Sequence, residues 1–226
     1  MKKMKRLSFL FSMLFAFLIV PKFCLAATVE RTTTLDLSSL DLTVNQENVD
    51  EGWSFNASDK TLTLTDINFN VPGARGISIP GDMDVKIILV GENKIAANSA
   101  IAQDFNTTGT VTITGSGSLE MISYVYSSMK VNNLVIESGK IIANGEIDIK
   151  TKKNGIMLDV SNNLSAGTML GIKITGGTIN IDAEGYGIRY DTSSLGPGVV
   201  IPSKDILLDG ANIDFKNTIN CISSDE

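Results

Sequence analysis

The sequence contains no histidine, and this absence excludes several kinds of chemistry. Without an imidazole, the chain cannot form a Ser-His-Asp or Cys-His catalytic arrangement or a metal site with histidine ligands. Cysteine is nearly as scarce, because only Cys24 and Cys221 are present. If Cys24 is removed with a signal peptide, no disulfide can form within the chain. Cys221 is then expected to be buried as a small apolar residue rather than to act as a nucleophile.

Aromatic residues are also few, and isoleucine is abundant. Residues 27–226 contain nine aromatic residues and 25 isoleucines. Isoleucine is a good strand residue. The composition is therefore typical of a narrow core of stacked aliphatic side chains.

Long apolar runs are missing except at the start of the chain. A basic segment, residues 2–6, precedes an apolar run over residues 7–20, and Cys24 and Ala26 are small residues at the two positions that a signal peptidase reads. The run is shorter than the roughly 20 residues that a membrane span needs. The sequence predicts a cleaved signal peptide over residues 1–26 and a protein that is secreted or displayed at the cell surface. An uncleaved N-terminal anchor is the alternative.

Positive charge is scarce once the signal is removed. Residues 27–226 hold 14 basic and 25 acidic residues, a net charge of −11. Such a balance argues against nucleic acid and anionic membrane surfaces as partners. It is typical of a solvated extracellular protein, or of one that binds cations or neutral ligands.

After residue 60 the chain contains six copies of one short sequence pattern. Each copy has a short β-branched strand, a turn at glycine or aspartate, and a second apolar strand. The copies begin at Leu62, Ile87, Val111, Leu134, Ile172 and Ile206, and their turns contain Asp66, Gly91, Gly115, Gly139, Gly177 and Gly210. A unit of this size cannot bury its own apolar face, so the copies are expected to stack as a solenoid.

Two series of residues indicate the period of this repeat. The second strands are marked by Phe69, Ile95, Leu119, Ile141, Ile179 and Ile213, with spacings of 26, 24, 22, 38 and 34 residues. The first three spacings match one coil of a three-sided parallel β-helix, and the last two require loop insertions, for which residues 162–167 and 193–198 have the composition. The second series places a small residue before an isoleucine at residues 76–77, 100–101, 155–156, 187–188 and 221–222. Its missing member should lie within residues 126–129.

The predicted organisation is an N-terminal cap over residues 27–60 followed by a parallel β-helix over residues 61–226. Six coils at about 4.8 Å each give a rod about 29 Å long. Within the cap, Trp53 begins a hairpin with its turn at residues 56–60. Trp53 is expected in the core of the cap, with a platform for sugars as the alternative. The last coil has no comparable cap, so either the chain is truncated or a partner or symmetry mate covers it.

The most charged group of side chains is predicted at one corner. Asp182 and Glu184 alternate outward, the chain turns at Tyr186, and Arg189 and Asp191 then alternate outward again. Carboxylates beside an arginine could bind Ca²⁺ and an acidic sugar. The alternative is a solvated face with one surface ion pair, which contributes little to stability.

Two tyrosines form a second candidate for ligand binding. Tyr124 and Tyr126 are expected on one face of a strand, where their rings could support sugars, since they combine an apolar face with a polar edge. The alternative packs both tyrosines under the loop before Met129.

Over residues 61–222 the pattern resembles the right-handed parallel β-helix of pectin-lyase-like proteins. The segments 53–64 and 90–95 and the glycine-isoleucine pairs are similar to those of secreted bacterial β-helix proteins described as carbohydrate-binding-domain proteins. The resemblance implies an all-β, right-handed, single-stranded parallel β-helix of about six coils with an N-terminal β-hairpin cap. It also implies a protein that binds acidic plant polysaccharide with calcium. The catalytic carboxylate clusters of the pectin-degrading enzymes have no clear counterpart here.

Three functions follow as hypotheses. The leading one is a secreted, non-catalytic β-helix that binds polysaccharide or glycan, with Ca²⁺ as the one cofactor considered and no enzyme activity. The second is a surface adhesin or structural spacer that docks, or self-associates, through its open C-terminal coil. The third is a pectate-lyase-like polysaccharide lyase acting through Arg189 and its neighbouring acids.

Overall fold

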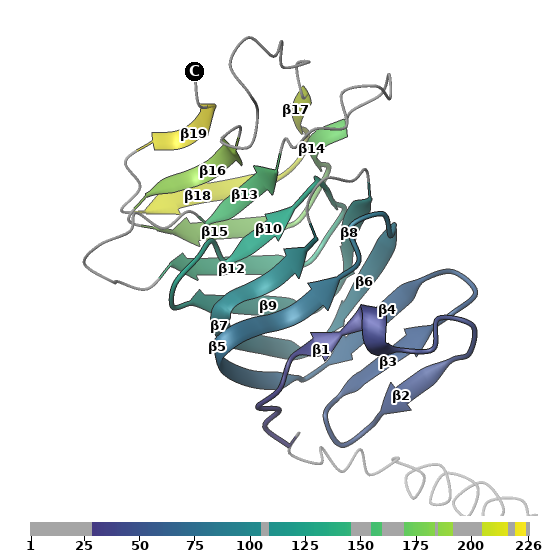
Figure 1. Cartoon of the computed structure of the whole chain (residues 1–226). Coiled ribbons are helices and arrows are strands. Elements are labelled where there is room, and N and C mark those ends of the chain that lie inside the picture. The colour runs from purple at the N-terminus through teal and green to yellow at the C-terminus, as the bar shows by residue number, and fades with distance from the viewer. Residues whose placement is uncertain are drawn as a thin grey trace, which may run out of the picture.

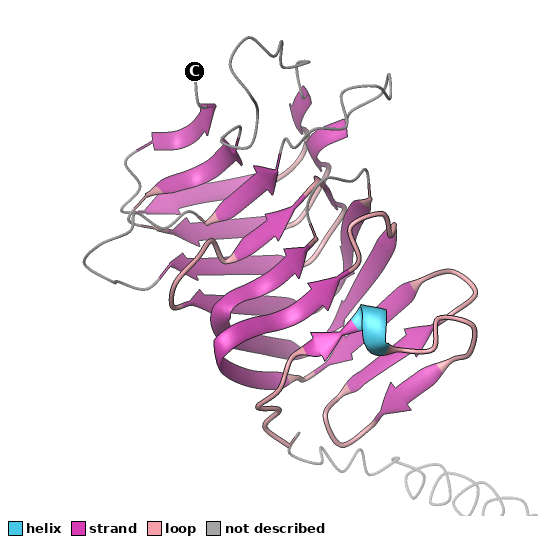
Figure 2. Ribbon diagram, viewed as in Figure 1, coloured by secondary structure: helices cyan, strands magenta, loops and turns pink. Residues whose placement is uncertain are grey.

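The computed structural model describes residues 29–104, 109–145, 155–159, 170–183, 185–191, 205–216 and 220–224. Within these ranges the chain is nearly all β, as predicted, and its one helical element is a single 3-10 turn, η1 (Leu37–Ser39) (Figure 2). No helix in this part of the chain has the length and apolar character to cross a membrane. The predicted signal, residues 1–26, and both predicted insertions, 162–167 and 193–198, lie outside the described residues.

Strands that follow one another in the chain separate onto three ladders, and each ladder stacks its strands in parallel (Figure 1). The first ladder contains β4 (Thr61–Thr65), β6 (Val85–Val90), β8 (Thr110–Gly115), β11 (Asn133–Ile136), β14 (Leu170–Ile174) and β17 (Asp205–Leu208). One row of residues runs in register along it, through Leu62, Ile87, Ile113, Ile136, Ile174 and Leu208.

The second ladder carries the second strand of each repeat. It contains the first halves of β5 (Asn68–Ile79) and β7 (Glu92–Gln103), then β9 (Ser118–Ser123), β12 (Lys140–Gly145), β15 (Thr178–Asp182) and β18 (Asn212–Lys216). The row in register is Phe69, Ile95, Met121, Ala143, Ile181 and Phe215.

One step of the first predicted series, which marks the second strands, is therefore wrong. Ile95 lies opposite Met121, whereas Leu119 lies opposite Asn93, so this spacing is 26 residues and not 24. Leu119 and Met121 are two residues apart and both face inward, because side chains alternate with a period of two along a strand. The apolar pattern alone could not distinguish them.

The third ladder confirms the series of small residues. It contains β1 (Leu35–Asp36), the second halves of β5 and β7, β10 (Met129–Val131), β13 (Ile156–Asp159), β16 (Tyr186–Asp191) and β19 (Asn220–Ser224). Its row in register is Leu35, Ile77, Ile101, Met129, Ile156, Ile188 and Ile222. The missing member of the series is the pair Ser128-Met129, within the predicted segment.

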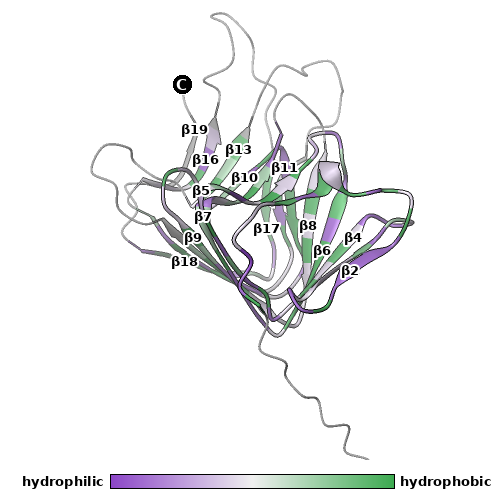
Figure 3. Cartoon of the chain, turned by 60° about the horizontal axis from the view of Figure 1, so that its bottom comes forward, coloured by the Kyte–Doolittle hydropathy of each residue, from purple (hydrophilic) through white to green (hydrophobic). Residues whose placement is uncertain are grey.

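The ladders form two sheets. β5 and β7 continue from the second ladder into the third, which joins these two ladders into one sheet of 11 strands. The first ladder continues into β3 (Trp53–Asn56) and β2 (Gln46–Asn48) and makes a sheet of eight strands. In Figure 3, β5, β7, β9 and β18 lie on one side and β4, β6, β8 and β17 on the other, with β10, β13, β16 and β19 along the top.

A single hydrophobic core lies between these sheets and runs from Leu35 to Tyr190. Alternation along the strands builds it, because Ile172 and Ile174 are buried while Lys173 between them is exposed. Each fully buried isoleucine stabilises the fold by about 1.5–3 kcal/mol relative to an exposed one.

The predicted turns at glycine or aspartate are present at every copy of the repeat. The backbone has a positive φ at Asp66 (52°), Gly91 (67°), Gly115 (115°), Gly139 (98°), Gly177 (85°) and Gly210 (72°). Glycine adopts this conformation without steric cost, and aspartate is one of the few other residues that tolerates it. The turn sends the chain from the first ladder to the second.

The positions of the second series require small residues for a different reason, which is steric. A Cβ on Gly76 would lie 2.3 Å from Cγ2 of Ile95, and one on Gly155 would lie 2.3 Å from Cγ2 of Ile181. The core isoleucines of the second ladder therefore pack directly against the backbone that enters the third ladder. A larger residue at these positions would have to displace them.

The predicted hairpin at the N-terminal end is confirmed. β3 and β4 are antiparallel, with Trp53 opposite Leu64, and residues 57–60 form the turn. Trp53 is half-buried and packs against the core, as expected of a core residue. Its indole Nε1 donates a hydrogen bond of 2.8 Å to Oε2 of Glu51, which also pairs with Arg31.

Candidate functional site

The predicted charged group lies at the corner where the second ladder passes into the third. β15 ends at Asp182 and β16 begins at Tyr186. The inward positions around this corner are filled by Ile181, Ala183 and Ile188, which are at most 1% exposed. Alternation therefore directs the half-buried side chains of Asp182 and Arg189 outward.

Arg189 and Tyr186 are in direct contact at this corner. The guanidinium carbon of Arg189 lies 5.4 Å from the centroid of the Tyr186 ring. This is within the range of a cation–π interaction, which holds the guanidinium over the aromatic face. The corner thus presents a positioned cation beside an aromatic ring.

Arg189 belongs to a basic row that the sequence analysis did not identify. Along the third ladder, Lys130 lies opposite Met157, and Met157 lies opposite Arg189. Lys130 and Met157 are half-buried on the outward face. Two strand spacings separate the two cations, about 10 Å. Only the strand register, which depends on loops of unequal length, brings these residues into one row.

Tyr124 and Tyr126 do not lie on a strand, so that prediction is wrong. β9 ends at Ser123, and both tyrosines follow in a bend. The hydroxyl of Ser123 donates a 2.9 Å hydrogen bond to the carbonyl oxygen of Asn98, and a hydrogen bond between a serine and the backbone favours a turn over a strand. The backbone N–H groups of Tyr124 and Tyr126 donate to the carbonyl oxygens of Ala97 and Asn98, each at 2.8 Å.

The bend leaves Tyr126 accessible. Its side chain is 62% exposed, whereas Tyr124 is half-buried. Packing under the loop before Met129 would have buried Tyr126.

The structure brings the two predicted groups to the same corner. The bend with Tyr126 leads into β10, and the turn before Tyr186 leads into β16, with β13 between them on the third ladder. The two groups are therefore about 10 Å apart along the stack. Residues 146–154, between β12 and β13 in the sequence, lie outside the described part of the chain.

Part of the predicted carboxylate group cannot be placed. Glu184 is outside the described residues, and of Asp191 only the backbone is described, opposite Asp159 at the end of β16. Among the side chains that the structure describes, no three of the types Cys, Asp and Glu lie close enough to hold a metal ion. A calcium site at this corner remains a prediction.

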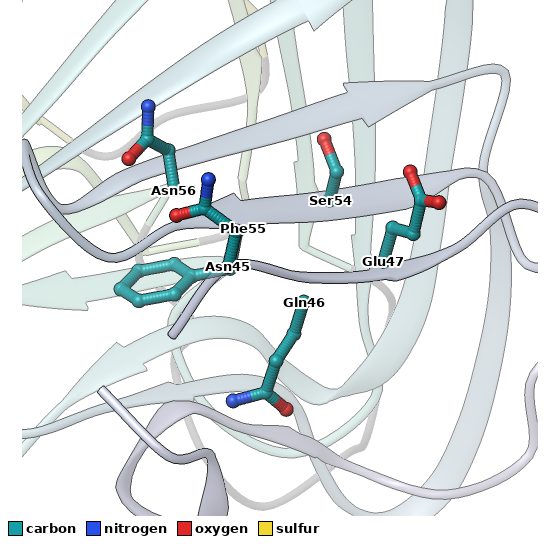
Figure 4. A pocket seen from close by; sticks show the side chains of 6 residues that line it. All are labelled: Asn45, Gln46, Glu47, Ser54, Phe55 and Asn56. Carbon is teal, nitrogen blue, oxygen red and sulfur yellow. The ribbon is translucent and has the colours of Figure 1, made fainter. Parts of the chain in front are cut away.

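A pocket of about 400 Å³ lies elsewhere, on the antiparallel pair of β2 and β3 at the N-terminal end, and the sequence analysis missed it (Figure 4). It is lined by Asn45, Gln46, Glu47, Ser54, Phe55 and Asn56. Glu47 and Ser54 are opposite each other on β2 and β3, and their side chains point to the same side (Figure 4). Alternation of polar residues with Trp53 and Phe55 is the signal that could have shown a polar outer face here.

The fold and this corner define an all-β protein of stacked parallel strands with a basic and aromatic outward edge. Comparison of the chain with protein-family models, with curated proteins and with solved structures found no match. The likeness to pectin-lyase-like proteins therefore remains a prediction from the sequence.

Proposed function

We propose that this chain is a secreted, non-catalytic, right-handed parallel β-helix that binds an acidic polysaccharide or glycan at the corner between the second and third ladders. The observation that carries the proposal is the contact of Arg189 with Tyr186, in a row with Lys130 and two strands from the exposed Tyr126.

The β-helix itself is supported by the three ladders. Each set of one strand or half-strand from every ladder pairs with the set that follows it, and the described residues contain six such sets. Rows of inward residues stay in register through all six, which is what a winding chain with one continuous core requires.

The chemistry of the corner suits an acidic sugar chain. Tyrosine rings offer apolar faces to sugar rings, and their hydroxyl groups hydrogen-bond to sugar hydroxyls. Arginine binds a carboxylate through two parallel N–H donors, whereas lysine acts as a point charge. Cations about 10 Å apart could therefore hold two carboxylates of one extended ligand. Strands held in a rigid stack fix these groups before the ligand arrives, which reduces the entropic cost of binding.

Binding is tested by calorimetry of the purified protein against polygalacturonate and against a neutral glucan, each in Ca²⁺ and in EDTA. Arg189→Ala and Tyr126→Ala are expected to weaken binding of polygalacturonate about fivefold to tenfold, because each removes a contact of about 1 kcal/mol. Lys173→Ala is the matched control, since Lys173 is an exposed cation on β14 of the first ladder.

Two outcomes contradict this assignment. Flat isotherms against both polymers in both buffers would rule out polysaccharide binding. If Lys173→Ala weakened binding of polygalacturonate as much as Arg189→Ala and Tyr126→Ala do, this corner would be ruled out as the binding site. Binding that EDTA abolishes would add calcium to the site.

A surface adhesin or spacer is the second candidate, and one observation favours it. Leu208 in the last strand of the first ladder is 45% exposed, although its partner Ile174 is fully buried. An end of the core that no described residue covers is suited to docking against another protein surface.

A further inference from the structure

The last described strands of the first and second ladders, β17 and β18, leave inward-facing apolar side chains incompletely covered. Leu208 is 45% exposed, whereas the residues in its row from Leu62 to Ile174 are fully buried. On β18, Ile213 and Phe215 are only half-buried, although Ile179 and Ile181, their partners on β15, are at most 1% exposed. The core therefore continues to this end of the stack without a cover from the described residues.

The backbone of β18 presents an unpaired edge at the same end. The N–H of Asn212 donates to the carbonyl oxygen of Gly177 at 3.1 Å, and the carbonyl oxygen of Lys216 accepts from the N–H of Ala183 at 3.3 Å. These residues face β15, so the N–H and C=O groups of Ile213 and Phe215 between them face the opposite edge. No described strand pairs with that edge. Proteins normally protect such an edge, because it can take up another strand.

The outward side chains of β18 carry opposite charges two residues apart. Asp214 and Lys216 are 59% and 63% exposed, and their charged atoms are 3.8 Å apart. A strand with this pattern is self-complementary, because antiparallel pairing about the residue between them places each charge opposite its counterpart.

We propose that β18 of one chain pairs with β18 of a second copy of the chain, antiparallel and centred on Phe215. In this register the two Phe215 residues exchange both of their backbone hydrogen bonds across the edge that β15 leaves open. Asp214 then lies opposite Lys216 of the second copy, twice in the dimer, at the positions where opposed side chains approach most closely. The two Phe215 side chains meet on the inward face and continue the core from one copy into the other.

Neighbouring registers fit less well. Centring on Asp214 places Asp214 opposite itself, which is destabilising for like charges. Centring on Ile213 places Asp214 opposite Asn212 and leaves Lys216 without a charged counterpart. The open backbone edge permits all three registers, since each pairs only Ile213 and Phe215 across it, and the charges select the register centred on Phe215.

The proposal is tested by sedimentation velocity of the purified protein across the micromolar range. We expect a dimer whose dissociation constant rises about tenfold or more with either Asp214→Lys or Lys216→Asp, since each change creates two pairs of like charges. The double variant Asp214→Lys/Lys216→Asp restores both opposite pairs and is expected to recover the original dissociation constant. Lys173→Asp, an exposed charge change on β14, is expected to leave it unchanged.

Circular dichroism of each variant separates loss of the interface from loss of the fold, because the double variant also restores the ion pair between Asp214 and Lys216 within one chain. A monomer at every concentration would overturn the proposal. A dimer that both single variants leave unaltered, or one that the double variant fails to restore, would overturn it as well.

Discussion

At the scale of single residues, the corner between the first and second ladders depends on backbone conformations that few residues adopt. Gly91 has φ of +67°, and Asp66 beside it on the neighbouring turn has φ of +52°. Oδ1 of Asp66 accepts a 2.7 Å hydrogen bond from the N–H of Glu92. A Cβ on Gly91 would lie 1.9 Å from that same oxygen. The turn of one repeat is therefore shaped to receive the side chain of the preceding one.

This close approach predicts the cost of Gly91→Ala. The substitution is expected to lower the free energy of unfolding by about 2–3 kcal/mol, since it combines backbone strain with displacement of the Asp66 carboxylate. Gly73→Ala is the matched control, because Gly73 has φ of +84° but no atom within 4 Å of an added Cβ. It is expected to cost about 1 kcal/mol, as strain alone. Equal losses for both variants in urea unfolding would show that the Asp66 contact is unimportant.

At the scale of elements, each strand has one buried face and one face toward solvent. The pairing along each ladder keeps the buried faces of successive strands on the same side. In β8, Ile113 is fully buried while its neighbour Thr112 is half-buried on the outward face. Ile113 lies between Ile87 and Ile136, and both of these are also fully buried. A single strand therefore offers two adjacent positions with opposite tolerance of charge.

We expect Ile113→Lys to abolish cooperative unfolding or to cost more than about 4 kcal/mol, because it places an unpaired ammonium group in the core. Thr112→Lys is expected to change stability by about 0.5 kcal/mol or less, since its side chain faces outward. Urea unfolding followed by circular dichroism measures both. If the two variants lost stability equally, β8 would not have the described inward and outward faces.

At the scale of the whole molecule, two opposed electrostatic features coexist. The chain after residue 26 has a net charge of −11, whereas the proposed site contains Lys130 and Arg189 on one row. An acidic ligand is repelled by the molecule as a whole and attracted by this row at short range. Salt screens charges beyond about 8–10 Å, so it weakens the long-range repulsion as well as the attraction of exposed cations.

The stacked strands are also the main source of stability, because the chain after residue 26 has a single cysteine. The melting temperature is therefore expected to be the same with and without a reducing agent. Thermal unfolding of the purified protein in both conditions measures this. A lower melting temperature under reduction would show a disulfide that joins two chains through Cys221, or one that includes a retained Cys24.

The sequence by itself determined the all-β class, the repeating unit and the positions of its turns, since these depend on local chemistry. A glycine or aspartate at positive φ, a small residue under a core isoleucine, and alternation along Ile172-Lys173-Ile174 can each be recognised without knowledge of the rest of the chain. Even the segment that holds the absent member of the second series, residues 126–129, followed from the period alone.

Only the tertiary structure decided the register between strands and the composition of the outward corner. Met121 rather than Leu119 lies opposite Ile95. The two residues are both apolar and two positions apart, so the sequence pattern does not distinguish them, and the pairing of β9 with the whole of β7 selects Met121. Lys130 meets the row of Arg189 across loops of unequal length, and the bend after Ser123 exposes Tyr126 through hydrogen bonds to β7. These contacts join residues far apart in the chain, so the physical forces that set them act only after the strands have stacked.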